Sequence, residues 1–442
     1  MTRVETSDLA VLLDTPAELE SFTAEPADSL KTIRIGLAGC GVVGGALVRM
    51  LHESAGAIAA RHGVRFELSR VLVRDVTRDR GVPLTPTVFT NDAASFNEED
   101  VDVVVEAIGG EDTAAEIARS ALGRGKKFVT ANKQLIASTA PELTALAQRS
   151  AAALDFGAAV GGSAPVISLL RDLLGTATPA SVRGILNGTS NYVLTLVERG
   201  MSFADALDSA RRAGLAEADC SRDLDGRDAA AKLTIICWLS FGITPSALSI
   251  RRLPLTPSTD RLVHHAAELG GKIRVISECV ALRGRRVTAT VEPVVVPPHS
   301  SFGRTEFEDN RVEVDLGWSA PLTVSGPGAG GPPTATALLS DLLHSSLPPT
   351  QRRPNGVPFA PCDDLREHEW LVITECSGDL VVRELVKTGR PATRVDDFGS
   401  DTRILARASR SEISQALLPL RMRGLEPSVA RVELTERHPD LQ

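Results

Sequence analysis

The chain has 442 residues, more than one ordinary hydrophobic core accommodates, so we expect two or three domains. Its 43% hydrophobic and 24% charged residues are typical of a soluble globular protein, and its net charge of -8 excludes the strongly basic surface of a nucleic-acid-binding protein. The six cysteines are scattered without metal-ligand spacing, so we expect reduced thiols. The sequence has neither a signal-peptide pattern nor an apolar run of about eighteen residues, so we expect a cytoplasmic protein without membrane contact.

Residues 1–30 contain seven acidic residues and one arginine, which predicts a flexible acidic extension. The character changes at Lys31, where a β-branched run leads into G-C-G-V-V-G (39–44) and then an amphipathic stretch. This motif between a strand and a helix is the signature of a dinucleotide-binding Rossmann domain. We expect the cofactor's pyrophosphate to lie at the helix N-terminus against the backbone of five residues, Gly39, Gly41, Val42, Val43 and Gly44.

The second predicted strand, F-E-L-S-R-V-L-V-R-D, ends near Arg74, where an NAD-preferring site usually places an acid. A guanidinium there suits the 2'-phosphate of NADP, and Arg78 and Arg80 follow closely. Alternatively, Asp75 bonds the ribose and Arg74 only faces solvent. We expect NADP to be preferred and NAD to be possible.

Two further strands are predicted in V-D-V-V-V-E-A-I-G-G (101–110) and K-K-F-V-T-A-N-K (126–133). Ligands of an open parallel sheet bind at the carboxyl ends of its strands, which places Lys133 at the site. We assign to cofactor binding, together with Lys133, the residues Gly109, Thr130 and Asn132.

The middle of the chain alternates predicted helices, at about 141–152 and at 166–174, with glycine-containing turns. In N-G-T-S-N (187–191), Gly188 and Thr189 offer donors that suit a carboxylate, although Asn-Gly is also the common hairpin turn. Two alternating stretches at 272–282 and 286–296 predict a mostly antiparallel sheet. The run G-P-G-A-G-G-P-P then opens a helix that we expect to return to the first domain, with close backbone approach at Gly328.

Polar chemistry concentrates in G-L-A-E-A-D-C-S-R-D-L-D-G-R-D-A-A-A-K-L (214–233). Asp228 and Lys232 stand four residues apart on a predicted helix, so they share one face and can touch. Such a pair is usually a solvated surface contact, but this helix continues into an apolar run that predicts burial. Because a buried ion pair is costly unless it is used, the pair indicates a site for acid-base chemistry.

By these motifs the chain resembles the homoserine dehydrogenases over roughly residues 32–343. The resemblance implies reduction of L-aspartate 4-semialdehyde to L-homoserine with a nicotinamide cofactor, and usually a homodimer formed through the central sheet. It implies that Lys133 and Lys232 are the catalytic lysines. It also implies that the substrate is bound by Glu217, Asp223, Asp228, Gly188 and Thr189.

Two positions depart from the family pattern. Gly157 replaces an acidic residue that helps to bind a monovalent cation, which would leave only the backbone of Val160, Gly162 and Ala164. Leu215 replaces a tyrosine that precedes the substrate-binding glutamate. Two alternatives therefore stay open beside the homoserine reaction: a reductase for a related amino-acid semialdehyde or amino alcohol, and a non-catalytic regulatory protein that binds the cofactor. Retention of both lysines argues against the second alternative.

The tail contains strand-like W-L-V-I-T-E and L-V-V-R-E-L-V, then R-I-L-A-R-A-S, a predicted helix at about 412–423 and a last strand. Its second half resembles the βαββαβ ligand-sensing (ACT-like) domain of many family members, in a degenerate form. We therefore expect an α/β protein with a Rossmann domain, an α+β catalytic domain with a mixed sheet and a small α+β tail. The expected division is an acidic extension (1–30), the NAD(P)-binding domain (31–155), the catalytic and dimerisation domain (156–325), the returning helix (326–346), a linker (347–365) and the ACT-like domain (366–442).

Overall fold

The computed structural model describes residues 30–98, 100–175, 177–346, 360–362, 364, 366–374, 378–390, 392–398 and 401–433. The predicted acidic extension, except for its last residue, and most of the predicted linker lie outside these ranges. None of the helices within them combines the length and the apolar content needed to cross a bilayer.

The first part of the chain forms a parallel six-stranded sheet with strand order β3-β2-β1-β4-β5-β6. This order confirms the predicted Rossmann architecture, in which the order reverses between β1 and β4 and leaves a crevice at their carboxyl ends. Its elements are β1 (Lys31–Ala38), α2 (Val42–Glu53), α3 (Ala55–His62), β2 (Val64–Leu72), η3 (Pro86–Val88), β3 (Phe89–Thr90), α4 (Ala93–Glu98), β4 (Val103–Glu106), α5 (Asp112–Gly123), β5 (Lys127–Thr130), α6 (Lys133–Arg149) and β6 (Leu154–Asp155).

The helix predicted at 141–152 is α6, and it begins eight residues earlier than expected. Pro141 does not mark its start but lies inside it. The helix begins at Lys133 because the side chain of Asn132 accepts hydrogen bonds from the backbone N–H groups of Gln134 and Leu135. Lys133 is therefore the first residue of a helix and not the end of a strand.

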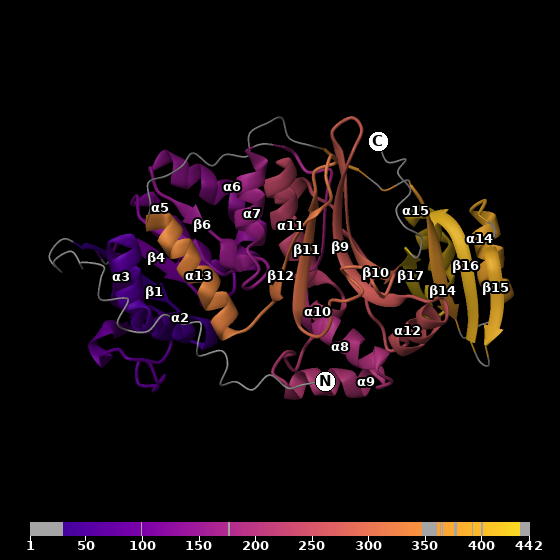
Figure 1. Ribbon diagram of the computed structural model, residues 1–442, viewed down its shortest axis with the longest axis horizontal. Coiled ribbons are helices and arrows are strands. Elements are labelled where there is room, and N and C mark those ends of the chain that lie inside the picture. The colour runs from indigo at the N-terminus through magenta and orange to yellow at the C-terminus, as the bar shows by residue number, and fades with distance from the viewer. Residues whose placement is uncertain are drawn as a thin grey trace.

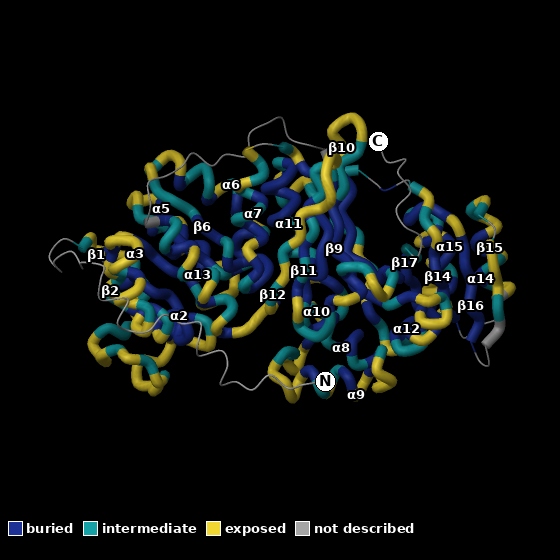
Figure 2. Tube along the Cα trace, viewed as in Figure 1, coloured by how far each residue is buried: buried dark blue, intermediate teal, exposed yellow. Residues whose placement is uncertain are grey.

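The second part is built on a mixed eleven-stranded sheet whose main path runs β12-β11-β7-β9-β10-β17-β14-β16-β15. The long antiparallel pair β9 and β10 agrees with the antiparallel sheet predicted for these two stretches and lies buried in the middle of the molecule (Figure 2). Its elements up to the returning helix are η4 (Gly157–Ala159), α7 (Val166–Leu174), β7 (Ser181–Ile185), α8 (Gly188–Glu198), α9 (Phe203–Arg212), α10 (Ser221–Leu224), α11 (Arg227–Phe241), η5 (Pro245–Ala247), β8 (Arg251–Arg252), α12 (Thr259–Glu268), β9 (Lys272–Leu282), β10 (Arg286–Val296), β11 (Asp309–Asp315), β12 (Leu322–Pro327) and α13 (Gly331–Ser346).

Helix α13 packs against α2 and beside β5, so it rejoins the nucleotide-binding part although it follows the second sheet in sequence (Figure 1). Its buried Ala335, Leu338 and Leu342 complete the apolar core between α2 and β1. Helix α13 thus packs with the elements of the first sheet.

From β14 to β17 the elements follow the order βαββαβ, and their sheet continues the central one because β17 pairs in parallel with β10. The prediction that L-V-V-R-E-L-V forms a strand is wrong. This run lies in helix α14, where Val381 and Leu385, four residues apart, are fully buried on one face. The elements are β13 (Ala360–Pro361), β14 (Glu367–Thr374), α14 (Gly378–Lys387), β15 (Ala392–Phe398), β16 (Asp401–Ser409), α15 (Arg410–Arg421) and β17 (Ser428–Val432).

Candidate active site

The predicted pair on α11 is formed and is extended by a second lysine, Lys133, from the start of α6. The Nζ atom of Lys232 lies 2.9 Å from Oδ2 of Asp228, and the Nζ atom of Lys133 lies 3.0 Å from Oδ1 of the same carboxylate. Lys232 is 8% exposed and also donates a hydrogen bond of 2.6 Å to the carbonyl oxygen of Leu186. One carboxylate therefore holds two ammonium groups that come from different halves of the fold.

The electrostatics of this centre are set by burial and by the two lysines. Burial alone would raise the pKa of Asp228, but the charges of Lys232 and Lys133 and the amide of Asn187 outweigh it, so the pKa lies well below its usual range. The neighbouring Asp223 behaves in the opposite way, because burial and the charge of Asp228 raise its pKa. Asp228 is thus a permanent anion, whereas Asp223 takes up a proton more readily than an exposed aspartate.

The residues assigned to substrate binding lie around this centre at different depths. Gly188 and Thr189 begin helix α8, so the Asn-Gly pair starts a helix and does not form a hairpin turn. The hydroxyl of buried Thr189 donates a 2.6 Å hydrogen bond to the carbonyl oxygen of Leu215, which ties the loop between α9 and α10 to this helix. Glu217 lies exposed on that loop. The structure therefore joins Asp228 directly to the lysines, links Asp223 to Asp228 through Asn187, and leaves Glu217 on the exposed loop.

The glycine loop after β1 has the shape that a pyrophosphate requires. A side chain at Gly39, whose φ is +96°, would collide with the backbone of Ala107 at 2.6 Å, and one at Gly44 would collide with the carbonyl of Gly39. Gly41 has open space around it instead. A side chain has no room at Gly39 and Gly44, where the chain turns, whereas the space at Gly41 lets a phosphate approach the N-terminus of α2. These residues therefore fit a dinucleotide.

A buried carboxylate that the sequence analysis missed organises the other side of this crevice. Glu106 ends β4 and accepts hydrogen bonds from the N–H groups of Ile108 and Gly109 and from the hydroxyl of Thr130. Burial raises its pKa, and these hydrogen bonds oppose that effect. The side chain of Asn132 in turn donates to the carbonyl oxygen of Gly110. An acid at the end of an otherwise apolar strand was the signal that could have identified it.

Arg74 and Gly328 are the remaining residues predicted to bind the cofactor. Arg74 lies exposed two residues beyond the end of β2. In the glycine loop, burial raises the pKa of the Cys40 thiol, and the charges of Arg80 and Arg49 oppose this effect. A side chain at Gly331 would meet the carbonyl of Val42 at 2.9 Å, so the segment that contains Gly328 leads directly to the glycine loop.

A carboxylate that was not predicted from the sequence lies against the loop expected to bind a monovalent cation. A side chain at Gly157 would lie 2.5 Å from Oδ1 of Asp341, a residue of α13. Asp341 accepts a hydrogen bond of 3.0 Å from the N–H of Ala158. Burial and the charge of Asp155, against the opposing charge of Arg171, raise the pKa of Asp341 to about 7. The carboxyl group of Asp341 therefore occupies the space that a side chain at position 157 would take.

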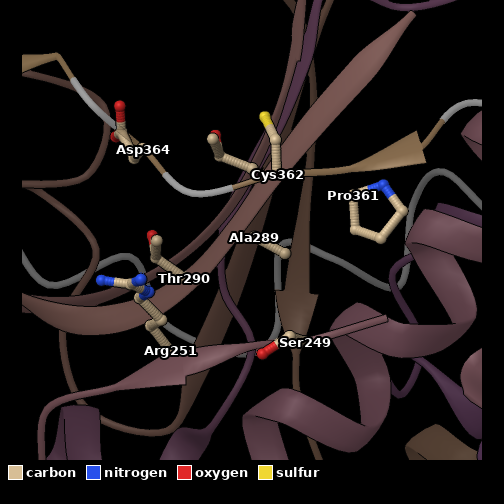
Figure 3. Close-up of a pocket in the computed structure, with 8 residues that line it drawn as sticks. Ser249, Arg251, Ala289, Thr290, Pro361, Cys362 and Asp364 are labelled. Atoms are coloured by element: carbon tan, nitrogen blue, oxygen red, sulfur yellow. The ribbon is translucent and has the colours of Figure 1, made fainter. Parts of the chain in front are cut away.

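A cavity of about 290 Å³ lies at the edge of β10, next to β8 and β13 (Figure 3). None of the predicted site residues belongs to its lining, which consists of Ser249, Arg251, Thr288, Ala289, Thr290, Pro361, Cys362 and Asp364. The lysine centre and the glycine loop thus form a site separate from this cavity.

Comparisons with known proteins agree with this geometry. Residues 39–156 match the family model described as "Homoserine dehydrogenase, NAD binding domain", and residues 165–343 match the model described as "Homoserine dehydrogenase". A homoserine dehydrogenase of Mycobacterium tuberculosis is 37% identical over 327 residues, which cover 73% of this chain and 74% of that protein. A solved homoserine dehydrogenase from Thiobacillus denitrificans superposes with a TM-score of 0.81 at 27% identity, covering 92% of this chain and 99% of the other. A hyperthermophilic archaeal homoserine dehydrogenase solved with NADPH shares the fold, with a TM-score of 0.61 at 22% identity over 73% of this chain and all of the other.

Proposed function

The chain belongs to the homoserine dehydrogenase family, and we propose that Lys232 and Lys133 are its catalytic lysines in the reversible reduction of L-aspartate 4-semialdehyde to L-homoserine. It is accordingly an NAD(P)-dependent oxidoreductase. Membership of this family favours the homoserine reaction over a non-catalytic role and over the reduction of a related semialdehyde. The observation that carries the proposal is the contact of both lysines with the single carboxylate of Asp228.

Each residue of the centre has a role that follows from its charge and position. A bound nicotinamide supplies the hydride in the reductive direction, so negative charge grows on the carbonyl oxygen of the aldehyde. An ammonium group already held in place can stabilise that charge and deliver the proton. We assign this role to Lys232, because Asp228 and the carbonyl of Leu186 fix its Nζ atom. Lys133 provides the second cation.

We assign the binding of the substrate's two charged ends to the N-terminus of α8 and to the exposed loop between α9 and α10. The backbone of Gly188 and Thr189 at the start of α8 would bind the carboxylate, since a helix N-terminus favours anions. Glu217 would bind the ammonium group from the loop that Thr189 holds through Leu215. This hydrogen bond uses only the backbone of Leu215, so it is insensitive to the loss of the family's tyrosine.

For the cofactor, we propose a preference for NADP through Arg74, with NAD as a possible second cofactor. The glycine loop binds the pyrophosphate that both cofactors share, so only a group beyond β2 can discriminate between them. Arg74 has the charge for a 2'-phosphate and is exposed at the expected place. We further propose that the protein works as a cytoplasmic homodimer, which size-exclusion chromatography with light scattering would test.

The function is tested by following the absorbance of NADPH with L-aspartate 4-semialdehyde and with a panel of other amino-acid semialdehydes. Lys232→Ala should lower kcat about a hundredfold or more and leave cofactor binding intact, which is the range for a lost acid or charge-stabilising donor. Glu217→Ala should act mainly on the KM of the substrate. Near-parental turnover of a folded Lys232→Ala protein would contradict the assignment, and the ion pair would then be only structural.

A further inference from the structure

Asn187 lies at the junction of three elements of the candidate site. It follows β7, precedes α8 and is 5% exposed. Its Oδ1 atom accepts a hydrogen bond of 2.7 Å from the backbone N–H of Ser190, which caps the N-terminus of α8. This contact uses only the oxygen of the amide, so the nitrogen is available for a different task.

The nitrogen of the same amide bridges two carboxylates. Nδ2 of Asn187 donates a hydrogen bond of 2.7 Å to Oδ1 of Asp223 on α10 and one of 3.0 Å to Oδ2 of Asp228 on α11. An amide nitrogen has two hydrogens, so both of its donors are used. A helix cap requires neither bond.

The bridge matters because of what else Asp228 contacts. Its Oδ2 atom receives both the amide of Asn187 and the ammonium group of Lys232, while its Oδ1 atom receives Lys133. Without the amide, Asp223 and Asp228 would be two partly buried carboxylates with no donor between them, and like charges at close range repel. The donor therefore holds the acids at a fixed separation and fixes the plane of the Asp228 carboxylate.

We propose that Asn187 is a positioning residue of the reaction, whose amide nitrogen holds Asp228 in the orientation that places Lys133 and Lys232 together at the substrate oxygen. The proposal rests on the proposed roles of the two lysines. It separates two functions of one side chain: the oxygen serves the fold by capping α8, and the nitrogen serves the reaction by orienting a carboxylate.

The substitution Asn187→Asp separates these functions. Aspartate caps a helix about as well as asparagine does, so α8 keeps its cap, but the donor between the two carboxylates becomes an acceptor. The charged groups that face the new carboxyl group are Asp223 and Asp228 on the acidic side and Lys133 and Lys232 on the basic side. When protonated, the new group can donate to one of the acids again.

At pH 8 we expect Asn187→Asp to lower kcat about a hundredfold, the loss that a misplacement of about 1 Å produces, with the KM for NADPH within about twofold of the parent. As the pH falls, kcat of the variant should recover relative to the parent, because protonation restores a donor. Asn187→Ser also caps, but its hydroxyl is too short to bridge the two acids and does not titrate, so it should lose a similar factor without the recovery. A purely structural role would not produce this difference in pH profile.

Two controls make the result decisive. Ser202→Ala removes the cap of the exposed end of α9, and it should lower the unfolding temperature without changing kcat. Lys232→Ala is measured in parallel: if it keeps its turnover, the proposed function fails. If Lys232→Ala is inactive while Asn187→Asp and Asn187→Ser keep parental kcat and pH profile, only the role of Asn187 is overturned. Should Asn187→Asp not fold, the loss or retention of kcat in Asn187→Ser decides.

Discussion

Lys133 and Asp228 meet at 3.0 Å although the first lies on helix α6 of the nucleotide-binding part and the second on helix α11, which packs against the central sheet. Helices α6 and α11 pack against each other, and each of the two residues lies at the start of its helix. This contact joins the nucleotide-binding part of the fold to the part that we propose binds the substrate.

Replacement of Lys133 tests that junction. Lys133→Ala should lower kcat with L-aspartate 4-semialdehyde by about a hundredfold, because one of the two cations near the developing oxyanion is lost. Arg149→Ala, at the other and exposed end of the same helix, should leave kcat unchanged. Steady-state kinetics and thermal unfolding of both variants would check this, and equal kcat values for the two variants would contradict a role for Lys133.

Replacement of Arg74 tests the cofactor preference. Arg74→Ala should weaken NADP binding by about tenfold to a hundredfold and leave NAD binding nearly unchanged, because a hydrogen bond to a charged group contributes about 1.5 to 3 kcal/mol and NAD has no 2'-phosphate. Fluorescence titration of both cofactors measures the two affinities, with Arg61→Ala as a control for loss of an exposed positive charge. The idea fails if both cofactors weaken equally or if the parent protein binds NAD more tightly.

Titration with salts tests the cation site. We expect activity to be flat in sodium and potassium when tetramethylammonium chloride keeps the ionic strength constant, because Gly157 contributes no carboxylate and neutral carbonyls compensate poorly for an ion's lost hydration. A saturable activation by one ion would overturn this expectation. Asp341 would then be the acid to test, since its carboxyl group lies where a side chain at Gly157 would be, and Asp341→Asn should abolish the activation.

The buried carboxyl group of Asp341 also predicts how stability varies with pH. Its pKa is raised from 3.8 to about 7 in the fold, so the folded state binds the proton more tightly than the unfolded state does. The stabilisation is complete below about pH 4 and is lost as the pH rises through 7, with a total of at most about 4 kcal/mol. Asparagine cannot ionise and keeps an acceptor for the N–H of Ala158, so Asp341→Asn should remove this dependence.

Urea unfolding of the parent and of Asp341→Asn between pH 4 and pH 8 measures the effect as a difference, which removes the contributions of groups common to both proteins. The variant should gain stability relative to the parent as the pH rises. A difference that stays constant over this range would show that the pKa of Asp341 is not raised.

Local patterns in the sequence were enough to predict several features. The glycine motif between a strand and a helix predicted the nucleotide-binding sheet, and the spacing of Asp228 and Lys232 predicted their contact, since residues four apart on a helix lie on one face. Alternation of apolar residues predicted that β9 and β10 are strands of an antiparallel sheet. The short apolar run in α14 could not be assigned by the same means, because a run rich in valine and leucine fits a strand as well as a buried helix face.

Other features depend on contacts between segments that are distant in the chain, and only the tertiary structure decided them. Lys133 reaches Asp228 because α6 and α11 pack together, and the space beside Gly157 is filled by Asp341 because α13 returns to the first sheet. The bridge from Asn187 to two acids requires β7, α10 and α11 to converge. The sequence determined which residues carry charge and which local structure they adopt. Their partners were decided by how the chain packs, because electrostatic and hydrogen-bond contacts depend on distance in space and not on separation along the chain.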